Sequence, residues 1–295
     1  MSEVIVPKKK DGAMGVGIKR DYQGKEKGKK DAAPPAHPPN AYTSMFESFR
    51  DELDEHHDRR QRIGKVSRDV TALSKKIIFS LQRVRKLSQP IPERIQTEID
   101  GRLKEIAELL KTIQPDVQGM NRYRYPLICL EEFVEAVSFA HYLRHQTLMT
   151  AAEAQAALPV DIQMTAPDYV FGIFDLTGEM MRFATAVTAL SGSMPTGEIS
   201  SSSQEGKEAA SDKEKRTILT DMQDVNSLLH ICPTVGRYGI YSKKLSIMVE
   251  QVRKVERLGY GVTVRGNERP KGWMPDLNEG YPGGGGDGED VTMGD

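Results

Sequence analysis

The 295-residue sequence contains few cysteines and no long hydrophobic run. Its two cysteines, Cys129 and Cys232, are too few for a disulfide framework, and no apolar signal segment follows Lys8–Lys10. Both features indicate a reducing, intracellular compartment. No stretch of 18 apolar residues occurs, so we expect no membrane-spanning segment. Two cysteines and six scattered histidines also leave little material for a zinc site.

Charge of either sign is not in excess. The sequence has 41 Lys and Arg against 42 Asp and Glu, a net charge of −1, which excludes a uniformly basic nucleic-acid coat. Any nucleic-acid contact must therefore come from a local patch. Aromatic residues make up only 6% and hydrophobic residues 38%, so part of the chain is expected to pack against nothing.

Three segments have the composition of unpacked chain. Residues 1–40 carry nine Lys and Arg against five acids and end in a proline cluster, whereas residues 267–295 form an acidic, glycine-rich tail. Residues 191–215, rich in Ser, Glu and Lys, are predicted to form a mobile insertion loop. The clusters Lys8–Lys10 and Lys19–Arg20 form either a bipartite nuclear-import signal or a solvated tail. The expected location is cytoplasmic and nuclear.

Between these segments, residues 41–266 are predicted to form one all-α domain. From residue 40 to residue 89 there is no proline and one glycine, and apolar residues recur in steps of three and four. This pattern predicts a very long first helix of about 45 residues, roughly 65 Å at 1.5 Å per residue. Pro90 and Pro92 are expected to end it. Six further helices are expected, giving a seven-helix bundle: Glu93–Ile113, Pro126 to about Leu148, Ala151–Leu158, a helix capped by Thr165 and running to about Leu190, Ile218–Ile231 and Tyr238–Val264.

Two of these helices place acids on a face that should be apolar. At 100° per residue, Glu132 and Glu135 share one side of their helix with apolar residues, and Asp175 and Glu179 do the same on theirs. Glu131 lies about 100° from Glu132 and is expected to be ordinary surface. Because a buried, unpaired carboxylate is costly, four inward-facing acids need a compensating cation.

The compensating cation could be a metal ion or a basic side chain. An all-oxygen ligand set suits Mg²⁺ or Mn²⁺ rather than Zn²⁺, and such an ion could orient a phosphodiester and activate a water. Alternatively, each acid forms a salt bridge, as Glu179 could with Arg182, or faces water at a partly exposed seam. The spacing alone leaves both alternatives open.

The segments that carry these acids resemble motifs of the translin family, in particular of its translin-associated factor X (TRAX) branch. Residues 132–139, Glu-Phe-Val-Glu-Ala-Val-Ser-Phe, resemble the E-[YF]-V-E-A-V-S-F motif of that branch. Residues 168–182 resemble its D-Y-L-x-G…D-L-T-G-E-x-M-R stretch. Segments within residues 52–70 and 242–266 agree as well, so the resemblance covers roughly residues 41–266.

This resemblance implies a seven-helix translin fold and assembly with translin into a hollow hetero-oligomer. It implies a Mg²⁺-dependent endoribonuclease, with Mn²⁺ as a substitute ion, that trims single-stranded RNA. The implied substrates include passenger-strand fragments of small interfering RNA and tRNA-derived fragments, with single-stranded DNA as a further candidate ligand. The family's catalytic and metal-binding acids map onto Glu132, Glu135, Asp175 and Glu179. Translin itself is not catalytic and carries an apolar residue at the position of Asp175.

Basic residues provide candidate phosphate contacts. Arg182 either neutralises Glu179 or contacts a scissile phosphate. A larger group could contact RNA or form a solvated surface, and no single member of it can be chosen: Arg59, Arg60, Arg62, Lys65, Arg68, Lys75, Lys76, Arg83, Arg85, Lys243, Lys244, Arg253 and Lys254.

The sequence thus supports two functions of different classes. The first is a metal-dependent endoribonuclease subunit that acts with translin. The second is a non-catalytic structural partner that stabilises translin and modulates its binding of RNA or DNA, with the acids engaged in salt bridges.

Overall fold

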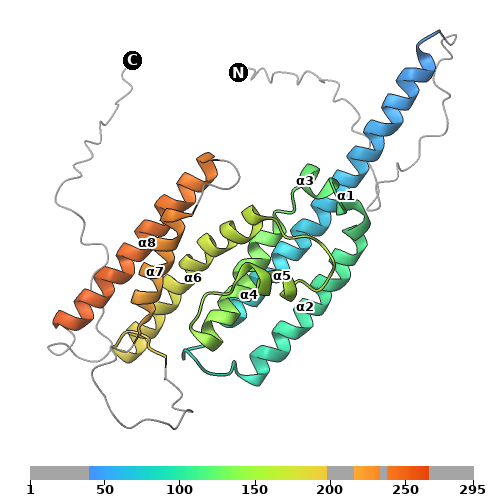
Figure 1. The fold of residues 1–295 in the computed structure, drawn as a ribbon. Helices are drawn as coiled ribbons and strands as arrows, with labels where there is room; N and C mark the ends of the chain where they lie inside the picture. The colour runs from blue at the N-terminus through green and yellow to red at the C-terminus, as the bar shows by residue number, and fades with distance from the viewer. Residues whose placement is uncertain (1–39, 198–215, 233–237, 266–295) are drawn as a thin grey trace, which may run out of the picture. The chain divides into compact units, whose positions relative to one another are not determined.

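The computed structural model describes residues 40–197, 216–232 and 238–265. Both predicted tails and residues 198–215 of the predicted insertion lie outside these ranges, as do the basic clusters considered for nuclear import. Within the described residues the chain forms eight α-helices, one short 3₁₀ helix and no strand (Figure 1). The prediction of an all-α fold is confirmed. None of the described helices combines the length and the hydropathy needed to cross a membrane.

The chain divides into two units, residues 1–54 and 55–295. The described part of the first unit begins α1 (Thr43–Leu81), and the Asn40 side chain accepts hydrogen bonds from the Tyr42 N–H (2.9 Å) and the Thr43 hydroxyl. Phe46 and Phe49 are 64% and 50% exposed and stack edge to face at 6.2 Å. The first part of the predicted apolar stripe is therefore exposed, and burial along α1 begins only at Ile63.

The second unit contains the rest of α1 and all other elements. These are α2 (Glu93–Ile113), the 3₁₀ helix η1 (Gln114–Val117), α3 (Asn121–Arg124), α4 (Cys129–His145), α5 (Ala151–Ala157), α6 (Ala166–Ser191), α7 (Ile218–Ile231) and α8 (Tyr238–Arg265). The predicted bounds of α2 and α7 are confirmed. Thr165 forms the predicted capping box with Asp168 at the start of α6.

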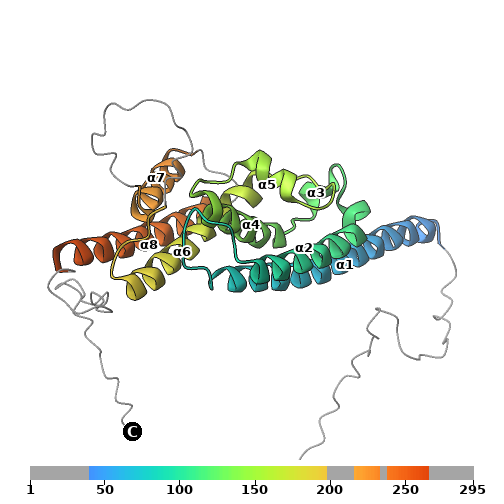
Figure 2. The same cartoon turned by 90° about the horizontal axis from the view of Figure 1, so that it is seen from below.

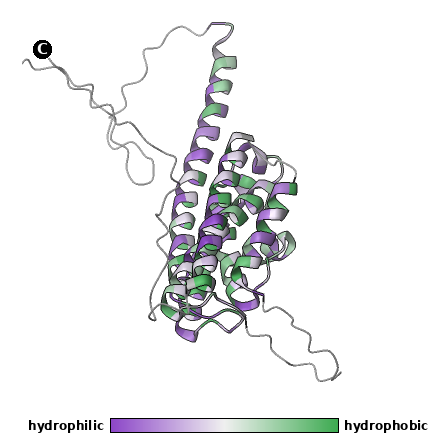
Figure 3. Cartoon of the chain, turned by 90° about the vertical axis from the view of Figure 1, so that its left-hand side faces the viewer, coloured by the Kyte–Doolittle hydropathy of each residue, from purple (hydrophilic) through white to green (hydrophobic). Residues whose placement is uncertain are grey.

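Within this unit, α6 packs against α4 on one side and against α8 on the other, and α7 packs against α8 (Figures 1 and 2). Helices α1 and α2 run side by side in both views, and Ser80 of α1 donates a hydrogen bond to Glu98 of α2 at 3.1 Å. The long helices mix hydrophobic and hydrophilic residues along their length (Figure 3). This composition is expected for amphipathic helices around one apolar core.

The end of α1 differs from the prediction. The helix stops at Leu81, nine residues before Pro90, so the prolines do not terminate it. In the connection that follows, Leu87 is buried in the core. The Ser88 N–H donates to the Leu143 carbonyl near the end of α4 at 3.0 Å, and Ser88 adopts a left-handed conformation with φ of 54°. Tertiary contacts of the connection, rather than proline, thus set the end of the helix.

The number of helices also differs. The prediction of seven omitted α3, a single turn of four residues that is too short to show periodicity. The run expected from Pro126 begins instead at Cys129, where the Ser67 hydroxyl accepts the Cys129 N–H at 3.2 Å. The first residues of the predicted insertion are ordered by local structure, because Ser191 ends α6 and Thr196 pairs with Thr217.

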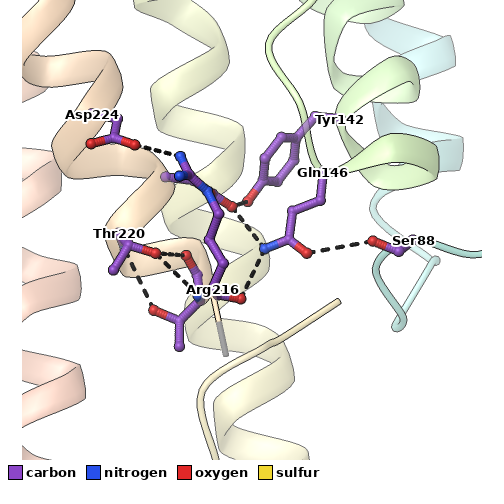
Figure 4. Close-up of polar contacts among 8 residues, drawn as sticks. Ser88, Tyr142, Gln146, Arg216, Thr220 and Asp224 are labelled. Atoms are coloured by element: carbon purple, nitrogen blue, oxygen red, sulfur yellow. Dashed lines mark hydrogen bonds and ion pairs between the residues drawn. The ribbon is translucent and has the colours of Figure 1, made fainter. Parts of the chain in front are cut away.

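A polar network joins α4 to the start of α7 (Figure 4). Asp221, only 5% exposed, accepts hydrogen bonds from the Tyr142 hydroxyl at 2.7 Å and the Gln146 amide at 2.9 Å. It also pairs with Arg216, which in turn pairs with Asp224. This buried carboxylate is fully partnered and connects elements distant in sequence.

Candidate active site

The four sequence-predicted acids line one pocket of about 590 Å³. Glu132 and Glu135 come from α4, and Asp175 and Glu179 come from α6. All four acids therefore line a common space. The remaining lining residues come from α1 and the residue that follows it, from α6 and, in one case, from α8: Lys75, Ile78, Phe79, Gln82, Gly178, Arg182 and Gln251.

Close approach of α4 and α6 brings the two pairs together. A Cβ atom built at Gly172 would lie 2.6 Å from Val134 Cβ and 2.8 Å from the Glu131 carbonyl oxygen, so the two backbones meet where only glycine fits. Gly172 lies one turn before Asp175, and Val134 lies between Glu132 and Glu135. The glycine thus positions both acidic pairs at the same level of the bundle.

Glu135 is the acid of this pocket whose pKa is most strongly perturbed. It is 9% exposed, and among the described residues its carboxylate accepts no hydrogen bond and forms no ion pair. Burial raises the pKa of Glu135 to about 8, and the negative charges of Asp175, Glu132 and Glu179 add to the shift. A raised pKa of this origin marks a carboxylate in a pocket that lacks positive charge at its centre.

Glu132 and Asp175 each contact a lysine from another helix. Lys75 of α1 lies 3.1 Å from Glu132. Lys244 of α8 donates to both oxygens of Asp175, at 2.6 and 2.7 Å. The Lys244 ammonium also lies 5.6 Å from the centre of the Phe171 ring, a cation–π distance.

Glu131 is not ordinary surface, contrary to the sequence-based expectation. Its carboxylate lies 3.7 Å from the Lys244 ammonium, so it shares this lysine with Asp175. Partial burial raises the pKa of Glu131. Glu131 does lie about 100° from Glu132 around its helix. However, α8 packs against α6 and brings Lys244 to this edge of the site.

Glu179 and Arg182 differ in exposure although they are neighbours. Glu179 is 6% exposed and accepts a hydrogen bond from the Gln82 amide at 2.8 Å. Its contact with Arg182 is longer, at 3.6 Å, and the Arg182 side chain is 62% exposed at the pocket rim. The guanidinium therefore neutralises Glu179 only weakly and remains accessible to a ligand in the pocket.

The donor set fits a hard divalent cation, although the side chains are not arranged as a ligand sphere. All the acids in the pocket offer oxygen, and no histidine or thiol lines it. Within the described ranges no three Asp, Glu, His or Cys side chains come together closely enough to hold a metal ion. Contacts with Lys75, Lys244 and Arg182 thus realise the salt-bridge alternative for Glu132, Asp175 and Glu179, but not for Glu135.

Two other polar residues near the site, Cys129 and Asp168, have contacts that indicate a structural role. The Cys129 thiol is buried at the start of α4, and burial raises its pKa to about 11, so it is not a reactive thiolate. Asp168 forms the capping box of α6 and pairs with the buried Arg122.

Comparison with known proteins identifies the class of the chain. Residues 58–266 match the profile of the translin family. A protein named translin-associated protein X from Rattus norvegicus is 30% identical over 261 residues, which cover 79% of this chain and 82% of the relative. A translin-associated protein X homolog from Schizosaccharomyces pombe is 33% identical over 143 residues, 47% of this chain and 59% of its own length.

A solved structure described as AfC3PO aligns with 75% of this chain and 97% of its own, at 17% identity and a TM-score of 0.47. The match to the family profile and to the relatives shows that the chain belongs to the translin family. Within that family its similarity is to translin-associated protein X, in agreement with the branch indicated by the sequence motifs.

Proposed function

We propose that this chain is the catalytic subunit of a complex with translin and that it cleaves single-stranded RNA in a Mg²⁺-dependent reaction. The observation that carries the proposal is Glu135, a buried carboxylate with no partner among the described residues, in a pocket with three other acids. Burial of an acid without a partner destabilises a fold, so its presence favours a functional role. Membership of the translin family and the names of the relatives support translin as the partner.

The acids that would hold the ion are Glu132, Glu135, Asp175 and Glu179. When bound, Mg²⁺ would lower the pKa of a coordinated water and stabilise negative charge on the phosphodiester. Lys75 and Lys244 form ion pairs with Glu132 and Asp175 at the wall of the pocket. Arg182, exposed at the rim, is placed to donate hydrogen bonds to a phosphate oxygen of the RNA.

The reaction can be tested with the complex reconstituted from this chain and translin and a labelled single-stranded RNA. Cleavage is expected with Mg²⁺ or Mn²⁺ and should disappear with EDTA. The Asp175→Ala complex should assemble normally but lose cleavage. A matched control, Glu105→Gln, changes an exposed acid of α2 outside the pocket and should leave the rate unchanged.

The second candidate function is a non-catalytic partner that stabilises translin and modulates its binding of RNA or DNA. The contacts of Glu132, Asp175 and Glu179 with protein groups favour it, because they make these acids structural. Undiminished cleavage by the Asp175→Ala complex, or its absence from the wild-type complex in Mg²⁺, would support this function and refute the first.

A further inference from the structure

A second pocket of about 610 Å³ lies beside the start of α4. Its lining comes from α1 and from the segment between α3 and α4: Arg60, Ile63, Gly64, Ser67, Arg68, Thr71, Arg124, Tyr125, Pro126 and Ile128. We call this pocket the arginine groove. Three of these residues are arginines and none is acidic, so the lining of the groove is net positive, whereas the acidic pocket has four acids against Lys75 and Arg182.

The three arginines of the groove have no partner in the part of the chain that the structure describes. Arg60, Arg68 and Arg124 are exposed and form no ion pair or hydrogen bond with the described residues. Arginines close to them in sequence behave differently, since Arg62 pairs with Asp116 and Arg122 pairs with Asp168. The chain thus neutralises the neighbouring guanidinium groups and leaves those of the groove available to an anionic ligand.

The floor of the groove is apolar. Ile63 and Tyr125 are buried beneath it, whereas the Ile128 side chain is 66% exposed at its edge. A large exposed apolar side chain among unpaired arginines is suited to a ligand that has flat apolar groups as well as negative charge. Nucleic-acid strands with unpaired bases have this chemistry, because their bases stack on apolar surface while the phosphates bind arginine.

The arginine groove and the acidic pocket are lined by residues of the same helix α1 and of the start of α4. On α1, Arg60, Arg68 and Lys75 fall within an arc of about 80° at 100° per residue, and Lys75 lies two turns, about 10 Å, beyond Arg68. On α4, Ile128 at the edge of the groove precedes Glu132 by four residues and therefore lies on the same face. The hydrogen bond from the Cys129 N–H to the Ser67 hydroxyl fixes the two helices at this point.

We propose that the arginine groove holds the backbone of the single-stranded RNA a few nucleotides away from the scissile bond, while the acidic pocket holds the bond itself. The assignment rests on the proposed function for the identity of the reaction. The groove would then act as a positioning site. Its arginines bind phosphates on one side of the cut, and the strand passes over Ile128 into the pocket that contains Glu132 and Glu135.

The test measures binding rather than cleavage. A fluorescein-labelled oligouridine RNA is titrated in EDTA with the translin complex of the wild-type chain or of the triple variant Arg60→Gln, Arg68→Gln and Arg124→Gln. The affinity should fall about tenfold or more at physiological salt, and the slope of log K against log salt should shrink by about 2, near 0.7 for each phosphate contact. A control of equal charge change, Lys86→Gln, Arg94→Gln and Lys104→Gln, alters exposed residues outside the groove and should leave both values unchanged.

A second variant makes the test independent of the stability of the triple variant. A Cβ at Gly64 would contact only Arg68 Nη1, at 3.9 Å, so Gly64→Glu fits and places a carboxylate one turn from Arg60 and Arg68. It should weaken RNA binding severalfold, whereas the uncharged Gly64→Gln should not.

The outcomes separate this inference from the proposed function. RNA affinity unchanged in both the triple variant and Gly64→Glu overturns the inference, even if the complex cleaves RNA. Loss of assembly with translin by either folded variant also overturns it, because the groove is then a protein interface. A wild-type complex that binds RNA through the groove but does not cleave supports the inference and refutes the nuclease function.

Discussion

Asp221 and Glu135 are both buried carboxylates on helices, but their surroundings are opposite. Asp221 accepts two hydrogen bonds from Tyr142 and Gln146 and pairs with Arg216. Glu135 has no such partner among the described residues and faces three further acids. A fully partnered carboxylate is explained by the fold, whereas an unpartnered one needs a ligand to explain it. The comparison therefore separates a structural site from a candidate catalytic site within one bundle.

The largest effect is expected from Glu135→Gln. The substitution keeps the shape of the side chain but removes the charge, so cleavage by the translin complex should fall about 100-fold or more, as for loss of a group essential to the reaction. The melting temperature should not decrease, since no protein contact is lost. A rate within twofold of wild type would show that Glu135 does not participate. Rates should be compared at saturating Mg²⁺ with protein of verified oligomeric state.

Asp221→Ala should have the opposite effect to Glu135→Gln, lowering stability while leaving cleavage nearly unchanged. The buried Tyr142 hydroxyl and the Gln146 amide lose their acceptor, which should lower the free energy of unfolding by roughly 2–3 kcal/mol. Cleavage per folded complex should stay within about twofold of wild type. The free energy of unfolding is measured by a denaturant titration monitored by circular dichroism. A stable variant with low activity would contradict the structural assignment of Asp221.

Gly172→Ala should lower both the stability of the protein and the rate of cleavage, because it disturbs the packing of α4 against α6. The added methyl would overlap Val134 and the Glu131 carbonyl, so α4 and α6 must separate. We expect a loss of roughly 1–3 kcal/mol in stability, typical of overpacking, and slower cleavage because the two acidic pairs move apart. Gly101→Ala on α2, where no atom lies within 4 Å of the new Cβ, is the matched control. Equal stability of the two variants would argue against close packing at Gly172.

The last expected effect is a dependence of stability on pH. In the absence of metal the folded state keeps a proton on Glu135 up to a pKa of about 8, whereas the unfolded state loses it near 4.5. Between these values the folded state binds more protons, so stability should fall with rising pH by at most about 1.4 kcal/mol per pH unit. Thermal melts of the complex in EDTA from pH 4 to 9 measure this slope. Glu135→Gln should remove this contribution, and an identical slope in the variant would contradict the raised pKa.

Local patterns in the sequence were sufficient to predict most helices and the convergence of the acids. The periodicity of α2 and the capping box of α6 depend on residues close in sequence, and the wheel positions of Glu132 and Asp175 follow from helix geometry alone. The end of α1 could not be predicted in this way, because Ser88 is held by a contact with Leu143.

The partners of the acids were likewise beyond local reasoning. The sequence places Lys75 and Lys244 only in a group of basic candidates for RNA contact, because they reach Glu132 and Asp175 from helices far away in sequence. The involvement of Glu131 was missed for the same reason. Such contacts depend on how helices pack, which no single helix encodes.

Binding of Mn²⁺ tests the central claim most directly. The complex of this chain with translin is titrated with Mn²⁺ while the electron paramagnetic resonance signal of the free ion is recorded. We predict a binding site in the wild-type complex that is lost in both Glu135→Gln and Asp175→Ala and retained in Asp221→Ala. Equal binding by wild type and the two pocket variants, or no binding by any of them, would contradict the assignment of the four acids as a metal site.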